Sequence, residues 1–160
     1  MPMDAANGLA RILTRHAGQF RGLHLGMTIE EIATLEGKQL ELLSDRDGER
    51  VYTLERTITK AGAGTPAERD KLVVTVVDGR ASEISYFLML DSKDEVAAIF
   101  KSLIATLTER FGKGTKDGAF IEYALPPAPP GPDARLWTGK YPERTPDGAQ
   151  HVIKIVVDPQ

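Results

Sequence analysis

The side chains best suited to metal binding or acid–base catalysis in this chain are the histidines His16, His24 and His151. They lie in three separate predicted elements, and none of them belongs to a metal-ligand motif such as H-x-x-x-H. The chain has no cysteine, which excludes disulfides, thiolate catalysis and cysteine-rich zinc sites. We therefore predict no metal site and no cofactor.

The sequence indicates neither a serine nucleophile nor a phosphate-binding loop. No G-x-S-x-G turn is present, although a catalytic triad can also assemble from distant segments. The stretch "AGAGTPAERDK" lacks the ending of a P-loop, and "FGKGTKDG" follows a predicted helix instead of opening one. Four carboxylates fall in the first turns of predicted helices, where the helix dipole stabilises each by roughly 0.3–1 kcal/mol: Glu30, Glu31, Asp94 and Glu95. We therefore predict no catalytic residues and a non-enzymatic protein.

Charge and hydropathy exclude two classes of partner. The net charge is −3 and the Lys and Arg residues are scattered among acids, so we predict no nucleic-acid binding. The longest apolar runs, such as "LVVTVV", are much shorter than the ~20 residues of a membrane span, so we predict no membrane insertion. Asp4, Asn7 and Arg11 interrupt the apolar segment that a signal peptide needs. We expect a cytoplasmic protein, or a periplasmic one if a signal peptide has been removed.

Aromatic side chains that could face outward are the candidates for a binding surface. Trp137 lies just after the proline-rich stretch and Tyr141 just beyond the same predicted strand, so we expect both near one rim of the sheet. Phe87 joins them if its strand is a neighbour and its side chain points to the face opposite Tyr86 and Leu88. Trp and Tyr are enriched among the residues that dominate binding energetics, although core packing is the commoner fate of a lone Trp. We predict that Phe87, Trp137 and Tyr141 form the binding site. The stretch "PPAPPGP" is interpreted as a stiff loop between strands.

The N-terminal part of the chain predicts a helix, an extended segment and a second helix. The apolar spacing in "NGLARILTRHAG" indicates a short helix, and "FRGLHLG" indicates a short strand. Thr28 and Glu31 have the spacing of a capping box that begins the next helix. Gly26 permits the sharp change of direction into that helix, and Gly37 ends it.

The rest of the chain predicts strands around one long helix. Segments 39–43 and 50–59 form a first hairpin, and segment 71–90 forms a second about the Asp78-Gly79 turn. Helix 93–111 follows, with an apolar stripe of Val96, Ile99, Phe100, Leu103, Leu107 and Phe111. Three further strands are expected at 119–125, 134–140 and 151–158, and loops at 61–70, 125–134 and 140–149. Consecutive strands without intervening helices exclude parallel winding. The prediction is one α+β domain over 1–160, an antiparallel meander sheet with helices packed on one face, and no internal repeat of fixed period.

The corner "FRGLHLGMTIEEIATLEG", together with "VVDGRASEI", "ERFGKG" and "LWTG", resembles a group of small bacterial domains with a G-x-x-L-G-M-[ST] corner. This pattern is similar to repeats of the beta-lactamase inhibitor protein type and to outer-membrane lipoproteins of the SmpA/OmlA type. The chain lacks the lipobox cysteine of the lipoproteins and the paired cysteines of the inhibitor. The resemblance implies protein binding by a curved sheet without catalysis. It transfers no functional residue, because the matching positions are explained by the folding of the corner.

Three functional hypotheses follow from these observations. The first is a non-enzymatic protein-binding domain, such as an inhibitor or immunity-type protein, whose partner is another protein. The second is a small-ligand-binding or hydrolytic domain with a pocket between helix 93–111 and the sheet. The third is a structural protein of the cell envelope whose signal peptide has been removed.

Overall fold

The computed structural model describes residues 23–59, 68–127, 129, 131–145 and 148–160. The predicted N-terminal helix and the beginning of the predicted strand in "FRGLHLG" lie outside the described residues.

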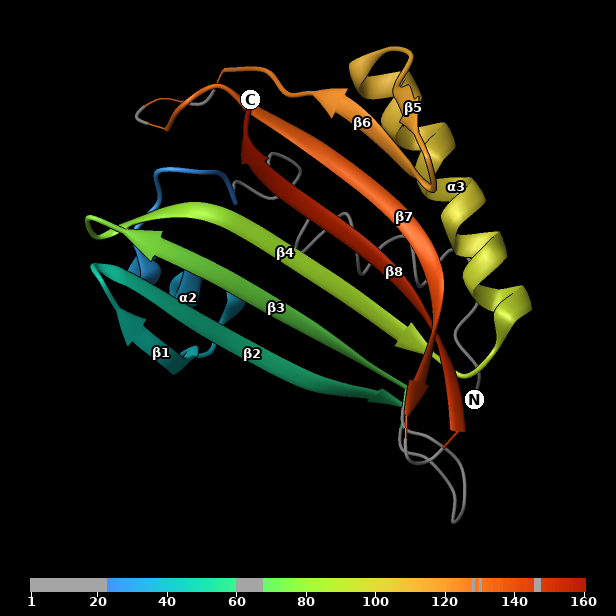
Figure 1. The fold of residues 1–160 in the computed structure, drawn as a ribbon, viewed down its shortest axis with the longest axis horizontal. Helices are drawn as coiled ribbons and strands as arrows, with labels where there is room; N and C mark the ends of the chain where they lie inside the picture. Colours follow the sequence, from blue (N-terminus) through green and yellow to red (C-terminus); the bar gives the residue numbers. More distant parts are fainter. Residues whose placement is uncertain (1–22, 60–67, 128, 130, 146–147) are drawn as a thin grey trace.

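One antiparallel sheet of eight strands dominates the described part of the chain (Figure 1). The strand order across the sheet is β1-β2-β3-β4-β8-β7-β6-β5, and every neighbouring pair is antiparallel. The strands are β1 (Glu41–Arg46), β2 (Glu49–Thr59), β3 (Glu68–Val77), β4 (Arg80–Leu90), β5 (Thr115–Asp117), β6 (Phe120–Ala124), β7 (Ala134–Thr145) and β8 (Gly148–Pro159). The predicted α+β class with an antiparallel meander sheet is confirmed.

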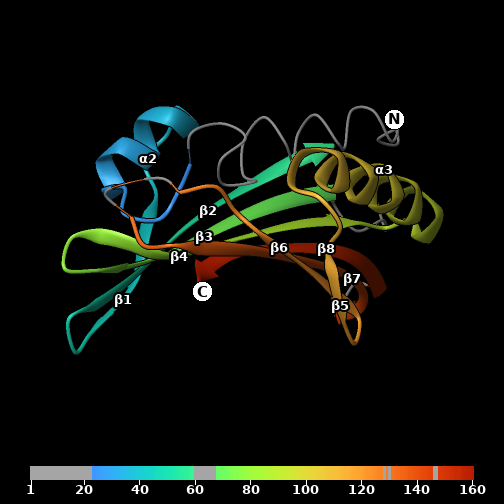
Figure 2. The same ribbon diagram turned by 90° about the horizontal axis from the view of Figure 1, so that it is seen from above.

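Two helices, α2 (Ile29–Glu36) and α3 (Lys93–Phe111), lie on the same side of this sheet (Figure 2). The stripe of α3 that was predicted to face the sheet is buried at Val96, Ile99, Leu103 and Leu107, and α3 contacts β4, β6, β7 and β8. Both edges of the sheet, at β1 and β5, turn away from the helices in Figure 2. The sheet is therefore concave on the side opposite the helices.

Short local signals account for the turns and the helix ends. Asp78 and Gly79 both have positive φ (53° and 78°), as the type I′ turn between β3 and β4 requires, and Asp47 and Gly48 repeat this geometry (53° and 80°) between β1 and β2. The capping box of α2 is complete: the Glu31 backbone N–H donates to Thr28 Oγ1 (3.2 Å), and the Thr28 N–H donates to Glu31 Oε1 (3.0 Å). These predictions are confirmed.

Some boundaries were predicted wrongly. Residues 23–28 form a turn and no strand, although the Gly26 N–H donates to Ala81 O at the beginning of β4 (2.9 Å). The expected loop at 140–149 is instead the end of β7 and the start of β8, which pair from Ala134↔Pro159 to Thr145↔Gly148. The sequence of this segment is polar, contains proline and shows no alternation of apolar and polar residues. Strand pairing depends on backbone hydrogen bonds, so the long hairpin forms without that alternation. Four strands follow α3 where three were expected, because the short, exposed β5 pairs only with β6.

The described chain consists of two halves with the same order of elements. Each half is a helix followed by four strands in a meander, α2 with β1–β4 and α3 with β5–β8. The halves meet where the last strand of each, β4 and β8, pair in antiparallel fashion. Corresponding elements differ in length, since α2 has 8 residues and α3 has 19, so the sequence shows no fixed period.

Candidate functional site: one face of the sheet

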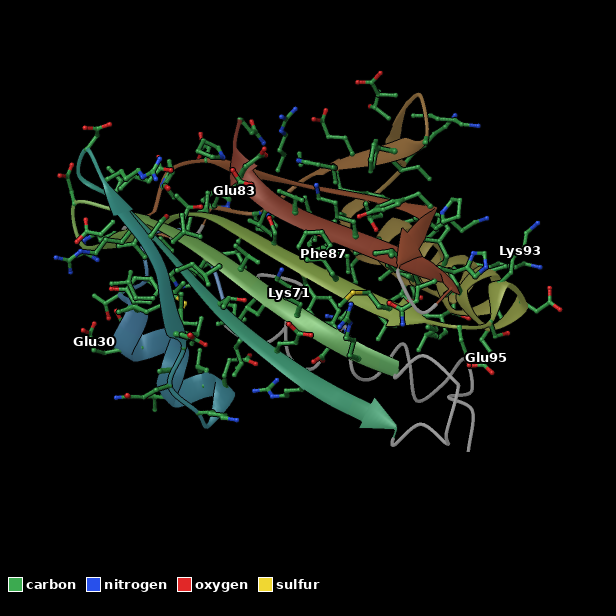
Figure 3. All side chains as sticks on the ribbon, turned by 60° about the horizontal axis from the view of Figure 1, so that its bottom comes forward. Glu30, Lys71, Glu83, Phe87, Lys93 and Glu95 are labelled. Atoms are coloured by element: carbon green, nitrogen blue, oxygen red, sulfur yellow. The ribbon has the colours of Figure 1, made fainter. Side chains whose placement is uncertain are left out.

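The two faces of the sheet have different surroundings. On β4, Tyr86 and Leu88 belong to the core cluster that also contains the buried stripe of α3. Phe87 lies between them in the strand and therefore points to the opposite face. In Figure 3 the labelled side chains Glu83, Phe87 and Lys71 lie over one side of the sheet, and Glu30 of α2 lies on the other. We call the side that carries Lys71, Phe87, Lys154, Trp137 and Phe120 the outer face.

The strand register brings a row of residues together across the middle of the outer face. Lys71 of β3 pairs with Phe87 of β4, and Phe87 pairs with Lys154 of β8. The row continues through Gly139 of β7, which pairs with both Lys154 and Phe120. Opposite residues in an antiparallel sheet share a face, so these side chains project on the same side.

Lys154 connects two aromatic rings on this face. Its Nζ atom lies 5.5 Å from the centroid of the Phe87 ring and 5.1 Å from that of the Trp137 ring. Both distances are within the range of a cation–π interaction. Among the described residues, no carboxylate forms an ion pair with Lys154. The ammonium group is therefore held by aromatic faces and left without a counter-charge from the described residues.

Three neighbouring side chains hold the Trp137 ring in place. The Phe120 ring meets it edge-on, with centroids 4.9 Å apart and an interplanar angle of 87°. The Trp137 Nε1–H donates to Asp158 Oδ2 (3.2 Å). Lys154 is the third neighbour. A side chain that is already ordered loses little rotamer freedom when it binds.

Gly139 makes room for this arrangement. A Cβ atom at this position would lie 2.5 Å from Cδ1 and 2.7 Å from Cε1 of Phe120, closer than carbon atoms approach one another. The Phe120 ring therefore occupies the space that a side chain at position 139 would need. The sequence did not single out Gly139 or Phe120, because their contact joins two strands that only the register brings together.

An ion-pair network borders the aromatic group. Arg135 Nε donates to Asp158 Oδ1 (2.7 Å), and Arg135 Nη1 donates to Glu122 Oε1. The hydrogen bonds with Asp158, and then those with Glu122, raise the pKa of Arg135 above its usual value, so the guanidinium is charged at every physiological pH. Asp158 thus holds both Arg135 and the Trp137 indole in place.

Apolar side chains beside the aromatic residues of the outer face are buried although neither α2 nor α3 lies on this face. Val152 and Val156 of β8 are 0% exposed, and Met89 of β4 is 6% exposed. They do not belong to the core cluster on the helix side. Val156 pairs with Trp137, and Val152 pairs with both Met89 and Tyr141. The outer face therefore has a small apolar floor of its own.

The three predicted binding residues are placed differently from one another. Phe87 and Trp137 flank Lys154, whereas Tyr141 lies four residues further along β7, about 13 Å away at the usual rise of a strand. All three side chains are partly buried. Sequence reasoning missed Lys154, although it is the one charged residue within the apolar run "VIKIVV" and so could have been noticed.

A hollow lies between the beginning of α3 and the sheet, apart from the aromatic group on the outer face. It is an open depression of about 230 Å³ lined by Lys93, Val96, Lys140, Tyr141, Pro142 and His151. Lys93 is labelled at the start of α3 in Figure 3. His24 lies elsewhere, in the corner before α2, where its Nδ1 is 2.8 Å from Leu25 O. Within the described residues, no three His, Asp or Glu side chains gather as a metal site would require.

No matching family model, curated protein or solved structure was found for this chain. Neither helix of the described chain is long and apolar enough to cross a membrane.

Proposed function

We propose that this protein binds another protein through the concave outer face of its sheet, centred on Phe87, Lys154 and Trp137. The observation that carries this proposal is the pair of aromatic rings held around a lysine on a sheet face that neither α2 nor α3 covers. Protein interfaces are enriched in Trp and Tyr at their centres, where the rings contribute large contact areas at low entropic cost. A concave sheet offers such a site to a convex partner.

The chemistry around this group favours binding over catalysis. Apart from the Lys154 amine, the aromatic group contains no nucleophile or base among the described residues, and its charged neighbours Arg135, Asp158 and Glu122 are engaged with one another. The resemblance of the corner before α2 to inhibitor-type domains also supports a binding role. The finer form of the proposal is therefore an inhibitor or immunity-type protein whose partner is an enzyme or a toxin.

The test requires an identified partner and a variant that still folds. A protein recovered with the wild type from host extract should be purified, and its affinity measured by calorimetry for the wild type and for Trp137→Ala. Truncation of a central interface Trp typically costs 2 kcal/mol or more, about a 30-fold loss of affinity. Lys101→Ala on the exposed side of α3 is the matched control and should bind like the wild type.

Lys154→Met separates binding from folding. The Met side chain can still cover the apolar floor, but the charge that the two rings hold is lost. Weaker binding by this variant at unchanged thermal stability supports the outer face as the contact surface. Equal affinity of the wild type, Trp137→Ala and Lys154→Met would contradict the proposal.

The second candidate function is small-ligand binding in the depression at the beginning of α3. Its support is the grouping of Lys93, Lys140 and His151 around one hollow, which suits a small anion. A thermal shift of the wild type with an anionic metabolite, abolished in Lys140→Ala and retained in Trp137→Ala, would favour this function over protein binding.

A further inference from the structure

The edge strand β1 and the helix before it carry most of the exposed large hydrophobic side chains in the described part of the chain. Leu42 is 48% exposed, Leu43 is 56% exposed, and Leu35 of α2 is 46% exposed. Among the described residues, β1 pairs with β2 on one side only, so its other edge presents backbone N–H and C=O groups that no described strand pairs with. An open strand edge with exposed leucines is a surface on which a further strand can add.

The charges of β1 indicate which strand would pair with its open edge. The strand reads ELLSDR over Glu41–Arg46. If two copies of it run antiparallel about a point between Leu43 and Ser44, all six residues of each copy are paired. Glu41 of one copy then lies opposite Arg46 of the other, and the two-fold symmetry produces this pair twice. No ion pair of Glu41 or Arg46 occurs within the described residues, so both charges are available.

The faces of the strand agree with this register. Glu41 pairs with Thr53 of β2, and Arg46 pairs with Glu49. Thr53 and Glu49 lie four residues apart on β2 and therefore share a face of the sheet. Their partners Glu41 and Arg46 lie on that same face. In a regular strand, residues five positions apart would point to opposite faces, but the register of β1 shifts by one residue between Leu42 and Ser44. A slip of one residue would place Glu41 opposite Asp45 of the second copy, with like charges and mismatched faces.

We propose that β1 pairs antiparallel with β1 of a second copy of this chain, which joins the two sheets into one across a two-fold axis. Paired residues share a face, so the axis is perpendicular to the sheet and the outer faces of both copies lie on the same side. The dimer does not depend on the proposed binding function. If that function holds, the dimer presents two binding faces to one side and can bind a multivalent partner more tightly than one copy can.

The test is a charge swap followed by sedimentation equilibrium at several protein concentrations. Arg46→Glu and Glu41→Arg each turn two attractive pairs into repulsive ones, and each should raise the dissociation constant of the dimer about tenfold or more. The double variant carrying both changes restores opposite charges and should dimerise within about threefold of the wild type. Lys101→Glu makes the same charge change as Arg46→Glu on α3 and should have no effect. Circular dichroism melts confirm that each variant is folded.

Leu43→Lys provides a second, independent variant, because an edge lysine opposes strand addition without touching the charge pairs. It should also weaken the dimer. A wild type that stays monomeric at its highest soluble concentration overturns the proposal and leaves the edge to an extended segment of another protein. A wild-type dimer that neither single charge change weakens, or a double variant that fails to recover, overturns it as well, because the contact then lies elsewhere or in another register.

Discussion

Substitution of Gly139 by alanine should destabilise the protein through one specific collision. The added Cβ would lie 2.5 Å and 2.7 Å from two ring atoms of Phe120, and 3.0 Å from the Ala119 carbonyl oxygen. Overpacking of this kind costs typically 1–3 kcal/mol. Alanine also restricts the unfolded chain relative to glycine, which offsets about 0.4–1 kcal/mol. We therefore expect a net loss of about 1–2 kcal/mol in the free energy of unfolding.

Trp137 provides a convenient probe for this experiment because it is the only tryptophan in the chain and it contacts Phe120 edge-on. Urea unfolding followed by its fluorescence reports the free energy of unfolding. The native emission maximum reports whether displacement of the Phe120 ring exposes the indole to water. The Gly139→Ala variant should therefore show both a lower unfolding midpoint and a red-shifted native spectrum.

The double-mutant cycle with Phe120→Ala decides whether the collision is the cause. With the Phe120 ring removed, the methyl group of Ala at position 139 has space on the outer face, so Gly139→Ala should be neutral or stabilising by up to about 1 kcal/mol. If Gly139→Ala costs the same with and without the Phe120 ring, the reasoning is refuted, and the cost must arise from the backbone contact with Ala119.

The remaining predictions concern the packing of α3, the N-terminal cap of α2 and the ion pair between Arg56 and Glu36. Leu103→Ala should cost about 2–5 kcal/mol in denaturant unfolding, because Leu103 is fully buried between α3 and the sheet. A loss well below 1 kcal/mol would contradict that packing. Thr28→Ala should cost about 0.5–2 kcal/mol as a lost helix cap. The hydrogen bonds between Glu31 and Thr28 lower the pKa of Glu31 below its ordinary 4.5, so in an NMR titration the same variant should raise that pKa. Because the pKa of Glu31 is lower in the folded protein than in the unfolded chain, its ionised carboxylate stabilises the fold at neutral pH. This stabilisation declines as the pH falls below about 4.5 and is lost once the pH falls below the pKa of Glu31 in the folded protein. Arg56→Ala should cost about 1.5–3 kcal/mol in thermal or urea melts, because it removes a charged hydrogen-bond donor that lies 3.0 Å from the buried Glu36 carboxylate. A double Arg56→Met, Glu36→Met variant that is no more stable than Arg56→Ala would contradict this explanation.

The binding surface could be predicted only in part. Strand alternation was enough to direct Phe87 away from the core residues Tyr86 and Leu88, and the structure agrees. No sequence signal could place Phe87 beside Trp137, because 50 residues separate them and Lys154 of a third strand joins them. Tyr141 was expected near the same rim of the sheet as Trp137, just beyond its strand, but β7 continues through Tyr141, which lies four positions further along the strand.

Features that depend on neighbouring residues could be predicted from the sequence alone. The cap of α2 at Thr28, the stripe of α3 and the Asp78-Gly79 turn each depend on residues within a few positions of one another, and all of them appear as predicted. The antiparallel class also followed, because consecutive strands with short turns permit no other pairing. The pairing of β4 with β8 could not be predicted in this way, because strands so far apart along the chain carry no local signal for each other. The pairing of β4 with β8 joins the two halves, brings Phe87 to Lys154 and so forms the outer face. It is stabilised by the burial of apolar side chains from both halves in one core under α3.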